Sequence, residues 1–182
     1  MTMDVQITRA TADDASSAMP LLLAQFAEHD IRRSHREADE ALRGMLADAR
    51  WGTVLLARVP ASAPSPSPAP SPVAVTVGLA VLPYLWTLEH GGLVAWLDEL
   101  YVVPARRGQG IGRALLLAGI DAVRGDGCRA LELEVEADHL RAARLYQREG
   151  FERLTRTRYS LDLVTRPAAA IDPSDAKQGP TA

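Results

Sequence analysis

Three glycines spaced two residues apart, Gly108, Gly110 and Gly112, follow an apolar stretch and precede a segment with helical periodicity. Glycine lets the backbone turn sharply and lets a ligand approach it closely. The start of a helix exposes N–H groups without helical partners at the positive end of the helix dipole. The spacing therefore predicts a backbone site for an anion such as a phosphate group at this junction.

Two common phosphate-binding loops do not fit this spacing. A P-loop requires a lysine followed by serine or threonine after its last glycine, and no lysine follows here. A dinucleotide-binding turn counted from Gly108 requires glycine at the position that Arg113 occupies. The remaining pattern is Arg107-x-x-Gly110-x-Gly112 after a strand. A structural turn between strand and helix, without a ligand, is the alternative for this pattern taken alone.

Composition and charge indicate a globular protein of one domain. The chain has 182 residues, of which 47% are hydrophobic and 24% charged, and its net charge is −3. This balance predicts no nucleic-acid partner, and no apolar run reaches the ~20 residues of a membrane helix. The N-terminus lacks the features of a signal peptide. Because Cys128 is the one cysteine, we expect no intrachain disulfide and a reducing, cytoplasmic location.

Hydrophobic periodicity predicts strands and helices in alternation. Two amphipathic helices are expected early, the first capped by Thr11 and either kinked or begun late at Pro20, the second extending to Ala49. Strands are expected over residues 5–9, 53–59, 73–82, 97–103, 129–136 and 159–164, and further helices from Arg113 and after an N-cap at Asp138. This order predicts an α/β or α+β fold with a sheet of mixed direction.

A segment rich in Pro, Ser and Ala, residues 60–72, holds half of the 12 prolines. Prolines cannot pair within a sheet or continue a helix, and the segment lacks apolar residues to pack. We expect a loop insertion that extends a hairpin, with a linker between domains as the alternative. Residues 166–182 have no periodicity and are expected to form a disordered tail, which leaves residues 1–165 as one domain.

A second motif lies downstream of the glycines and reads Ala142-x-x-Leu145-Tyr146-x-x-x-Gly150-Phe151. Together, the two motifs resemble those of the GNAT superfamily of N-acetyltransferases in order and separation, with an alternating strand between them. The resemblance covers about residues 5–164. It implies a GNAT-like α/β (α+β) fold, with a mixed, mostly antiparallel sheet of six to seven strands flanked by about four helices.

The resemblance implies that the chain binds acetyl-CoA as a cosubstrate and acetylates a primary amine by direct nucleophilic attack. The loop would hold the pyrophosphate, the strand before it would bind the pantetheine arm through its backbone, and His139 occupies a position where the family usually has asparagine. The residues implied in acetyl-CoA binding are Leu100, Tyr101, Val102, Arg107, Gly108, Gln109, Gly110, Ile111, Gly112, Arg113 and His139.

Three residues are candidates for the proton transfers. Amine attack requires a neutral nucleophile, and a carboxylate can accept the proton of a primary amine whose pKa is near 10.4. Glu99, within the strand, and Glu89, in a glycine-containing loop, are the candidate bases; a structural ion pair and a solvated loop charge are the respective alternatives. Tyr146 occupies the position of the family's general acid, which protonates the departing thiolate, and a core tyrosine is its alternative.

The acceptor is expected to be a small-molecule or peptide amine, and the sequence does not choose between them. The four histidines show no metal-ligand spacing, so no metal site is expected. A homodimer is possible by analogy with similar folds. A non-catalytic sensor or interaction module that binds acyl-CoA on the same fold is the alternative to an enzyme.

Overall fold

The computed structural model describes residues 5–60 and 74–163, and the chain forms two compact units, residues 1–145 and 146–182. The expected loop insertion, apart from Pro60, and the expected C-terminal tail lie outside the described residues. In chain order the elements are β1 (Gln6–Arg9), the 3₁₀ helix η1 (Ala12–Asp14), α1 (Ala15–Glu28), α2 (His35–Ala47), β2 (Gly52–Pro60), β3 (Ala74–Thr87), β4 (Gly92–Leu97), β5 (Glu99–Val102), the 3₁₀ helix η2 (Pro104–Arg106), α3 (Ile111–Gly125), β6 (Ala130–Leu133) and α4 (Leu140–Arg148).

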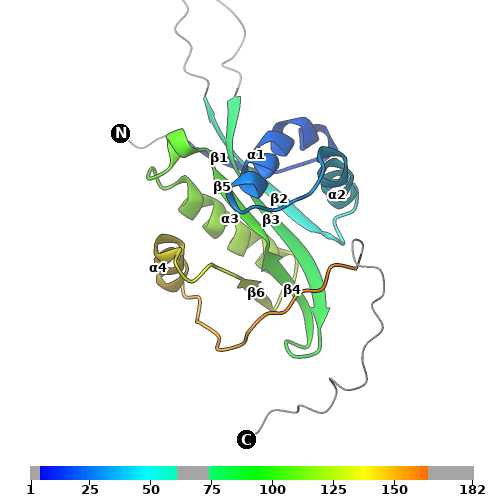
Figure 1. The fold of residues 1–182 in the computed structure, drawn as a ribbon, viewed down its shortest axis with the longest axis vertical. Helices are drawn as coiled ribbons and strands as arrows, with labels where there is room; N and C mark the ends of the chain where they lie inside the picture. Colours follow the sequence, from blue (N-terminus) through cyan, green and yellow to red (C-terminus); the bar gives the residue numbers. More distant parts are fainter. Residues whose placement is uncertain (1–4, 61–73, 164–182) are drawn as a thin grey trace, which may run out of the picture. The chain divides into compact units, whose positions relative to one another are not determined.

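The strands form one six-stranded sheet, in which five follow the order β1-β2-β3-β4-β6 and the sixth, β5, pairs with β3 outside this order (Figure 1). β4 and β6 pair in parallel, and the other pairings are antiparallel. The described elements thus confirm the expected α/β class, with a mixed, mostly antiparallel sheet and four α-helices.

The prediction of one strand over residues 97–103 is wrong, because strand pairing is interrupted at Asp98. β4 ends before this residue and pairs with the far end of β3, whereas β5 begins after it and pairs with β3 around residues 78–81. The amide of Asp98 donates to the carbonyl of Val81 at 3.0 Å, so the break is itself held against β3. β5 pairs with β3 alone, which leaves its other edge without a strand partner among the described residues.

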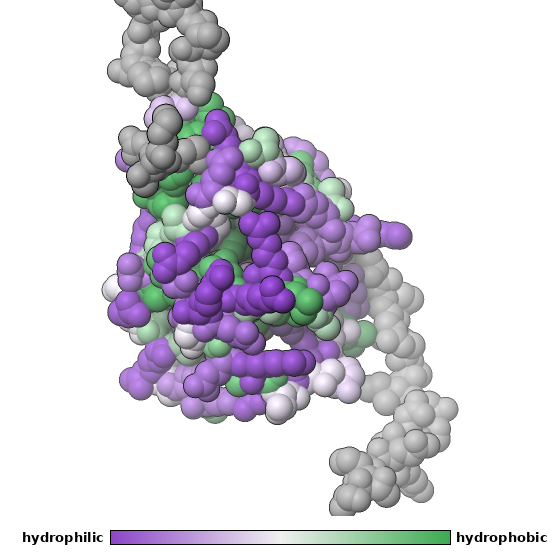
Figure 2. Space-filling view, turned by 90° about the vertical axis from the view of Figure 1, so that its left-hand side faces the viewer, coloured by the Kyte–Doolittle hydropathy of each residue, from purple (hydrophilic) through white to green (hydrophobic). Residues whose placement is uncertain are grey.

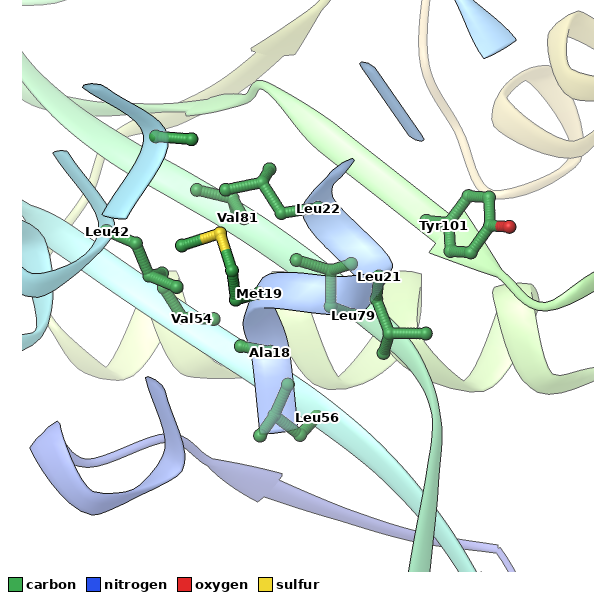
Figure 3. Close-up of a cluster of buried hydrophobic side chains, with 11 residues drawn as sticks. Ala18, Met19, Leu21, Leu22, Leu42, Val54, Leu56, Leu79, Val81 and Tyr101 are labelled. Carbon is green, nitrogen blue, oxygen red and sulfur yellow. The ribbon is translucent and has the colours of Figure 1, made fainter. Parts of the chain in front are cut away.

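α1 and α2 cover one face of the sheet. Figure 3 shows Leu21 and Leu22 of α1 near Leu79 and Val81 of the sheet; Tyr101 of β5 belongs to the same buried cluster. Apolar residues spaced three and four apart produce this helix face, as the periodicity predicts. The buried members of the cluster are Ala18, Met19, Leu21, Leu22, Ala38, Leu42, Val54, Leu56, Leu79, Val81 and Tyr101.

α3 packs on the opposite face. A Cβ atom added to Gly119 of α3 would lie 3.4 Å from Leu82 and 3.9 Å from Leu55. Leu55 therefore faces α3, whereas Val54 and Leu56 face the α1 cluster. This alternation follows from the two-residue period of a strand, and burial on both faces explains the continuous apolar sequence of β2.

The first helix begins where its cap predicts. The Asp14 carboxylate accepts hydrogen bonds from the Thr11 amide at 2.9 Å and from its hydroxyl at 3.2 Å. η1 follows this cap and leads directly into α1, so α1 does not begin late at Pro20, which lies inside the helix. The second helix ends at Ala47, two residues before the expected Ala49.

Other predicted boundaries are wrong as well. β3 continues to Thr87, beyond the expected residue 82, and α3 begins at Ile111, two residues before Arg113. β6 covers residues 130–133 and not 129–136. The carbonyl of His139 accepts from the Ala143 amide at 3.2 Å, so the cap of α4 is His139 and not Asp138. Residues 159–163, where a closing strand was expected, contain no strand. Strands depend on pairing partners that the local sequence does not specify, which explains why alternation alone overestimated two of them.

Candidate active site

The glycine loop adopts the conformation that an anion site requires. Gly108 has φ +78° and Gly110 has φ +85°, a left-handed conformation that costs glycine little. Gly110 caps α3, and the first intrahelical hydrogen bond runs from the Ala114 amide to the Gly110 carbonyl at 2.9 Å. The backbone N–H groups that precede Ala114 have no acceptor within the helix. Helix geometry therefore directs several amides and the positive end of the dipole out of the start of α3.

Space for a ligand is present at this loop. No atom lies within 4 Å of the position that a Cβ atom of Gly110 would take. Ile111, by contrast, is buried and anchors the first turn of α3 in the core. Figure 2 views the molecule from the side on which α3 starts in Figure 1, and hydrophilic side chains cover most of that face. The loop thus combines a fixed backbone with an open approach.

The other predicted loop residues lie around this opening. The Gln109 side chain donates to the Ala105 carbonyl at 3.4 Å, and the Arg113 side chain is exposed on the first turn of α3. A Cβ atom on Gly112 would make an ordinary 3.8 Å contact with Val102 of β5. Gly112 therefore faces the sheet, with room for a methyl group between α3 and β5.

Arg141 is a residue that the sequence reasoning did not select. Its Nη2 atom lies 3.7 Å from the position that a Cβ atom of Gly108 would take. A guanidinium group beside an anion site can add charge-assisted hydrogen bonds. A basic residue in the first turn of the helix of the second motif was the signal that could have identified it. His139 is exposed at the cap of the same helix.

The unpaired edge of β5 presents backbone groups beside this loop. The Val103 amide donates to Val77 of β3 at 2.9 Å, and the register pairs Tyr101 with Leu79. Because backbone groups alternate in direction along a strand, those of Leu100 and Val102 are directed away from β3. Of the three residues predicted to bind the pantetheine arm, Leu100 offers its amide and carbonyl at this edge, and Val102 offers its amide, because Arg107 Nε donates to the Val102 carbonyl. Tyr101 packs its side chain into the α1 cluster.

Glu99 is buried on the face of the sheet that α1 covers. Only 7% of it is exposed, and it lies two residues from Tyr101 on the same face. Burial and the neighbouring Asp98 charge raise the pKa of Glu99 to about 7. A hydrogen bond with the Gln25 side chain and the nearby His29 act in the opposite direction and lower this pKa, but by less. A carboxyl group with this pKa can exchange a proton at neutral pH.

The end of α1 contacts the residues around Glu99 and the loop. His29 lies with Nδ1 3.4 Å from Oε1 of Glu136, which follows β6. Arg107, expected at the phosphates, instead donates through Nη2 to both carboxylate oxygens of Glu28, at 2.7 and 2.8 Å, and through Nε to the Val102 carbonyl at 2.8 Å. The folded chain thus brings Arg107 of the glycine motif into contact with the end of α1, which is far away in the sequence.

Glu89 does not join these residues. It is exposed in the turn between β3 and β4, whereas Glu99 lies opposite Val81 in the register. The six residue steps along β3 from Val81 to Thr87 extend about 20 Å. The geometry therefore separates the two candidate bases and favours Glu99.

Tyr146 begins the second unit of the chain. Its ring contacts the Phe151 ring edge-on, with centroids 5.7 Å apart, and the Phe151 amide donates to the Tyr146 carbonyl at 3.0 Å. Burial raises the pKa of the Tyr146 phenol, which keeps it protonated at neutral pH. A protonated phenol is the form that a general acid requires.

The described part of the chain contains neither a metal-binding cluster nor a membrane-spanning helix. Within residues 5–60 and 74–163, no three His, Cys, Asp or Glu side chains lie close enough together to hold a metal ion. None of the helices in the same ranges has the length and apolar character to cross a bilayer.

Known proteins resemble this chain in sequence and in fold. The model of the acetyltransferase (GNAT) family matches residues 26–151. A mycothiol acetyltransferase from Kineococcus radiotolerans is 39% identical over 145 residues, which are 78% of this chain and 40% of that enzyme. The chain thus spans less than half the length of that relative.

Solved structures share the fold over most of both chains. A protein from Arthrobacter sp. FB24, described as an acetyltransferase, is 32% identical with a TM-score of 0.65, covering 87% of this chain and 96% of that one. An aminoglycoside N-acetyltransferase in complex with CoA is 17% identical with a TM-score of 0.65, covering 90% and 97%. At that identity, the second similarity concerns the fold alone.

Proposed function

Because this chain belongs to the acetyltransferase (GNAT) family, we propose that it transfers an acetyl group from acetyl-CoA to a primary amine by direct attack. The observation that carries this proposal is the arrangement of three features within residues 1–145. The start of α3 offers amides at an open loop, β5 offers an unpaired edge, and buried Glu99 follows the break at which β5 begins. Acetyl-CoA fits these features, because a diphosphate requires amides and a chain of amide groups can bind along a strand edge.

The proposed binding residues are the loop from Gly108 to Arg113 for the pyrophosphate, with Arg141 beside it. Leu100 and Val102 would bind the pantetheine arm through their backbone groups, and His139 would take the role of the family's asparagine. A backbone N–H at this edge can also stabilise negative charge on the thioester oxygen during attack.

Acetyl-CoA supplies the acyl group as an activated thioester. In the proposed reaction the amine nitrogen bonds to the acetyl carbon and the carbon–sulfur bond breaks. Glu99 accepts the proton that the amine loses, and Tyr146 donates its phenolic proton to the thiolate that leaves. The products are an N-acetylated amine and free CoA, without a covalent enzyme intermediate.

The substrate class that we propose is a small or peptide primary amine. The names of the similar enzymes concern mycothiol and aminoglycosides, and both are reasons to include small amines in a screen. Incubation with acetyl-CoA and a panel of amino sugars, polyamines, amino acids and peptide N-termini should release free thiol with at least one acceptor.

The same screen separates an enzyme from a binding module. Binding of CoA without thiol release for any amine would favour an acyl-CoA sensor on this fold, and absence of CoA binding would overturn both interpretations. A homodimer remains a proposal by analogy, and light scattering of the full chain measures it directly.

A further inference from the structure

Arg107 is the first residue of the glycine motif, yet its contacts in the structure are with the protein. Its Nη2 atom donates to both oxygens of Glu28, and its Nε atom donates to the Val102 carbonyl at 2.8 Å. Its guanidinium carbon lies 5.3 Å from the centre of the Tyr101 ring, a cation–π distance. One side chain therefore connects the last turn of α1 with the last two residues of β5.

The Val102 carbonyl has no strand partner, because it is directed away from β3. Arg107 satisfies this acceptor at the end of β5 nearest the glycine loop. An isolated ion pair whose side chains are 42% and 40% exposed would contribute little by itself. The added carbonyl and ring contacts fix the guanidinium in one orientation, so the group has a geometric role that an ordinary surface pair lacks.

The same turn of α1 reaches Glu99. Gln25, whose side chain hydrogen-bonds the Glu99 carboxyl group, lies three residues before Glu28 and thus on a neighbouring position of the helix surface. His29 follows Glu28 and also influences Glu99. The position of this helix end therefore determines how well Glu99 is shielded from water.

We propose that Glu28 and Arg107 form a positioning pair that holds the end of α1 against β5, and that this pair, rather than a phosphate contact, is the function of the motif arginine. The proposal rests on the function proposed above, in which Glu99 is the base. The pair keeps the β5 edge and the environment of Glu99 in their active arrangement. It thereby connects the strand edge proposed to bind acetyl-CoA with the base proposed to act on the amine.

A double-mutant cycle tests the pair. The variants are Glu28→Gln, Arg107→Gln and the double variant, with Arg43→Ala as control, since Arg43 forms an exposed ion pair with Asp39 at 2.8 Å on α2. Each is assayed with acetyl-CoA and with acetyl-pantetheine, which lacks the pyrophosphate and the nucleotide. We expect each single variant to lower kcat about tenfold with both donors, and the double variant to lose no more than either single variant.

The affinity for CoA distinguishes positioning from phosphate binding. A positioning pair predicts a Kd for CoA that stays within about twofold in all variants, whereas a phosphate ligand predicts that Arg107→Gln alone weakens CoA and leaves acetyl-pantetheine unaffected. The second pattern, or additive losses in the cycle, would overturn the proposal. Arg107→Lys, which keeps the charge but cannot satisfy Glu28 and Val102 together, should restore less than full activity.

The pH profile provides a further readout. The charged and polar groups facing Glu99 are Asp98, Gln25 and His29. Loosening the end of α1 admits water, so the acid limb of kcat/KM should move to lower pH in Glu28→Gln and Arg107→Gln, and not in Arg43→Ala.

Titration of the Glu99 carboxyl group by NMR measures the same shift without turnover. If the unmodified protein acetylates no amine, the proposed function is refuted. The NMR titration of Glu99 then still tests whether Glu28 and Arg107 control its environment. An unchanged Glu99 titration in both single variants would refute the pair's role even if the protein is an active acetyltransferase.

Discussion

At the residue scale, Glu99, the base that we propose, combines burial with a pKa near neutrality. It is buried on the α1 face of β5, and desolvation with the neighbouring Asp98 charge raises its pKa to about 7. A base is most effective when its pKa lies near the working pH. The strand alternation places Glu99 beside Gln25 and not in solvent, so its protonation depends on how α1 packs.

Replacement of the Glu99 carboxylate by an amide should remove the proposed general base. We expect Glu99→Gln to lower kcat by at least about 100-fold, the low end for loss of a general base. For the unmodified protein, kcat/KM should rise with pH through about 7, because the ionised form is the active one. Thiol release across pH 5–9 measures both effects.

Glu40→Gln is the matched control, because Glu40 forms an exposed ion pair with Arg36 at 2.9 Å on α2. An unchanged rate and an unchanged acid limb in Glu99→Gln would remove Glu99 from the reaction.

The same carboxyl group should make the stability of the protein depend on pH. Its pKa is about 7 when folded and near 4.5 when unfolded, so the folded state binds the proton more tightly. This contribution is fully present below about pH 4.5 and is lost as pH rises through about 7. It amounts to roughly 2–3 kcal/mol between pH 5 and pH 8.

Urea denaturation at pH 5 and pH 8 measures this contribution as the difference between the unmodified protein and Glu99→Gln. The free energy of unfolding of the unmodified protein should fall relative to the variant as pH rises. Parallel changes in the two proteins would show that the pKa of Glu99 is not raised in the folded state.

At the element scale, two glycines at the junction of β5 and α3 differ in how strictly the backbone requires them. Gly110 has φ +85° at the cap of α3, with open space where its Cβ atom would lie. Gly112 lies within the first turn with an ordinary helical conformation and faces Val102. Gly110 is needed for its left-handed backbone conformation, whereas the position of Gly112 has room for a Cβ atom at ordinary contact distance from Val102.

This difference predicts opposite results for two similar substitutions. Gly110→Ala introduces a methyl group at a left-handed position, costs about 1 kcal/mol of stability and should weaken CoA binding roughly tenfold or more. Gly112→Ala adds a helix-favouring residue with a tolerable 3.8 Å contact, so its Kd for CoA should stay within about twofold.

Calorimetric titration with CoA, with urea denaturation for stability, measures both variants. Equal losses of affinity would mean that the ligand approaches Gly112 as closely as Gly110. Retained affinity in Gly110→Ala would place the diphosphate elsewhere.

At the scale of the whole molecule, the sheet is continuous through β2 and β3, which pair from Gly52 and Pro83 to Pro60 and Ala74. The two helical layers of the first unit cover opposite faces of this central pair, with α1 and α2 on one face and α3 on the other. The residues between Pro60 and Ala74 connect two strands that are already paired at that point. The fold therefore does not require a long connection there.

Replacement of residues 61–73 by an Asn-Gly turn should preserve the sheet. A two-residue turn fits an antiparallel pair, and the shorter loop should raise the free energy of unfolding by about 1–2 kcal/mol through lower closure entropy. Thermal denaturation measures the stability, and CoA titration should give an unchanged Kd. A loss of folding would show that this segment contributes to the core.

Local sequence patterns determined much of this protein. The spacing of Gly108, Gly110 and Gly112 predicted the turn and the helix start, and the periodicity of the first two helices predicted which of their faces pack on the sheet. These features depend on residues a few positions apart, whose conformational preferences act within the segment itself. The fold class follows from them, and so does the proposal of an anion site at the start of α3.

Tertiary structure alone decided the rest. Asp98 breaks the expected strand because β4 and β5 pair with different parts of β3, and a pairing partner is not encoded locally. Arg107 meets Glu28 79 residues away in the sequence, and Glu99 acquires its pKa from burial beneath α1. The sequence by itself specified which groups could do chemistry. Which of them are buried, and which charges they contact, depends on packing between distant segments, because desolvation and ion pairing arise only once the chain is folded.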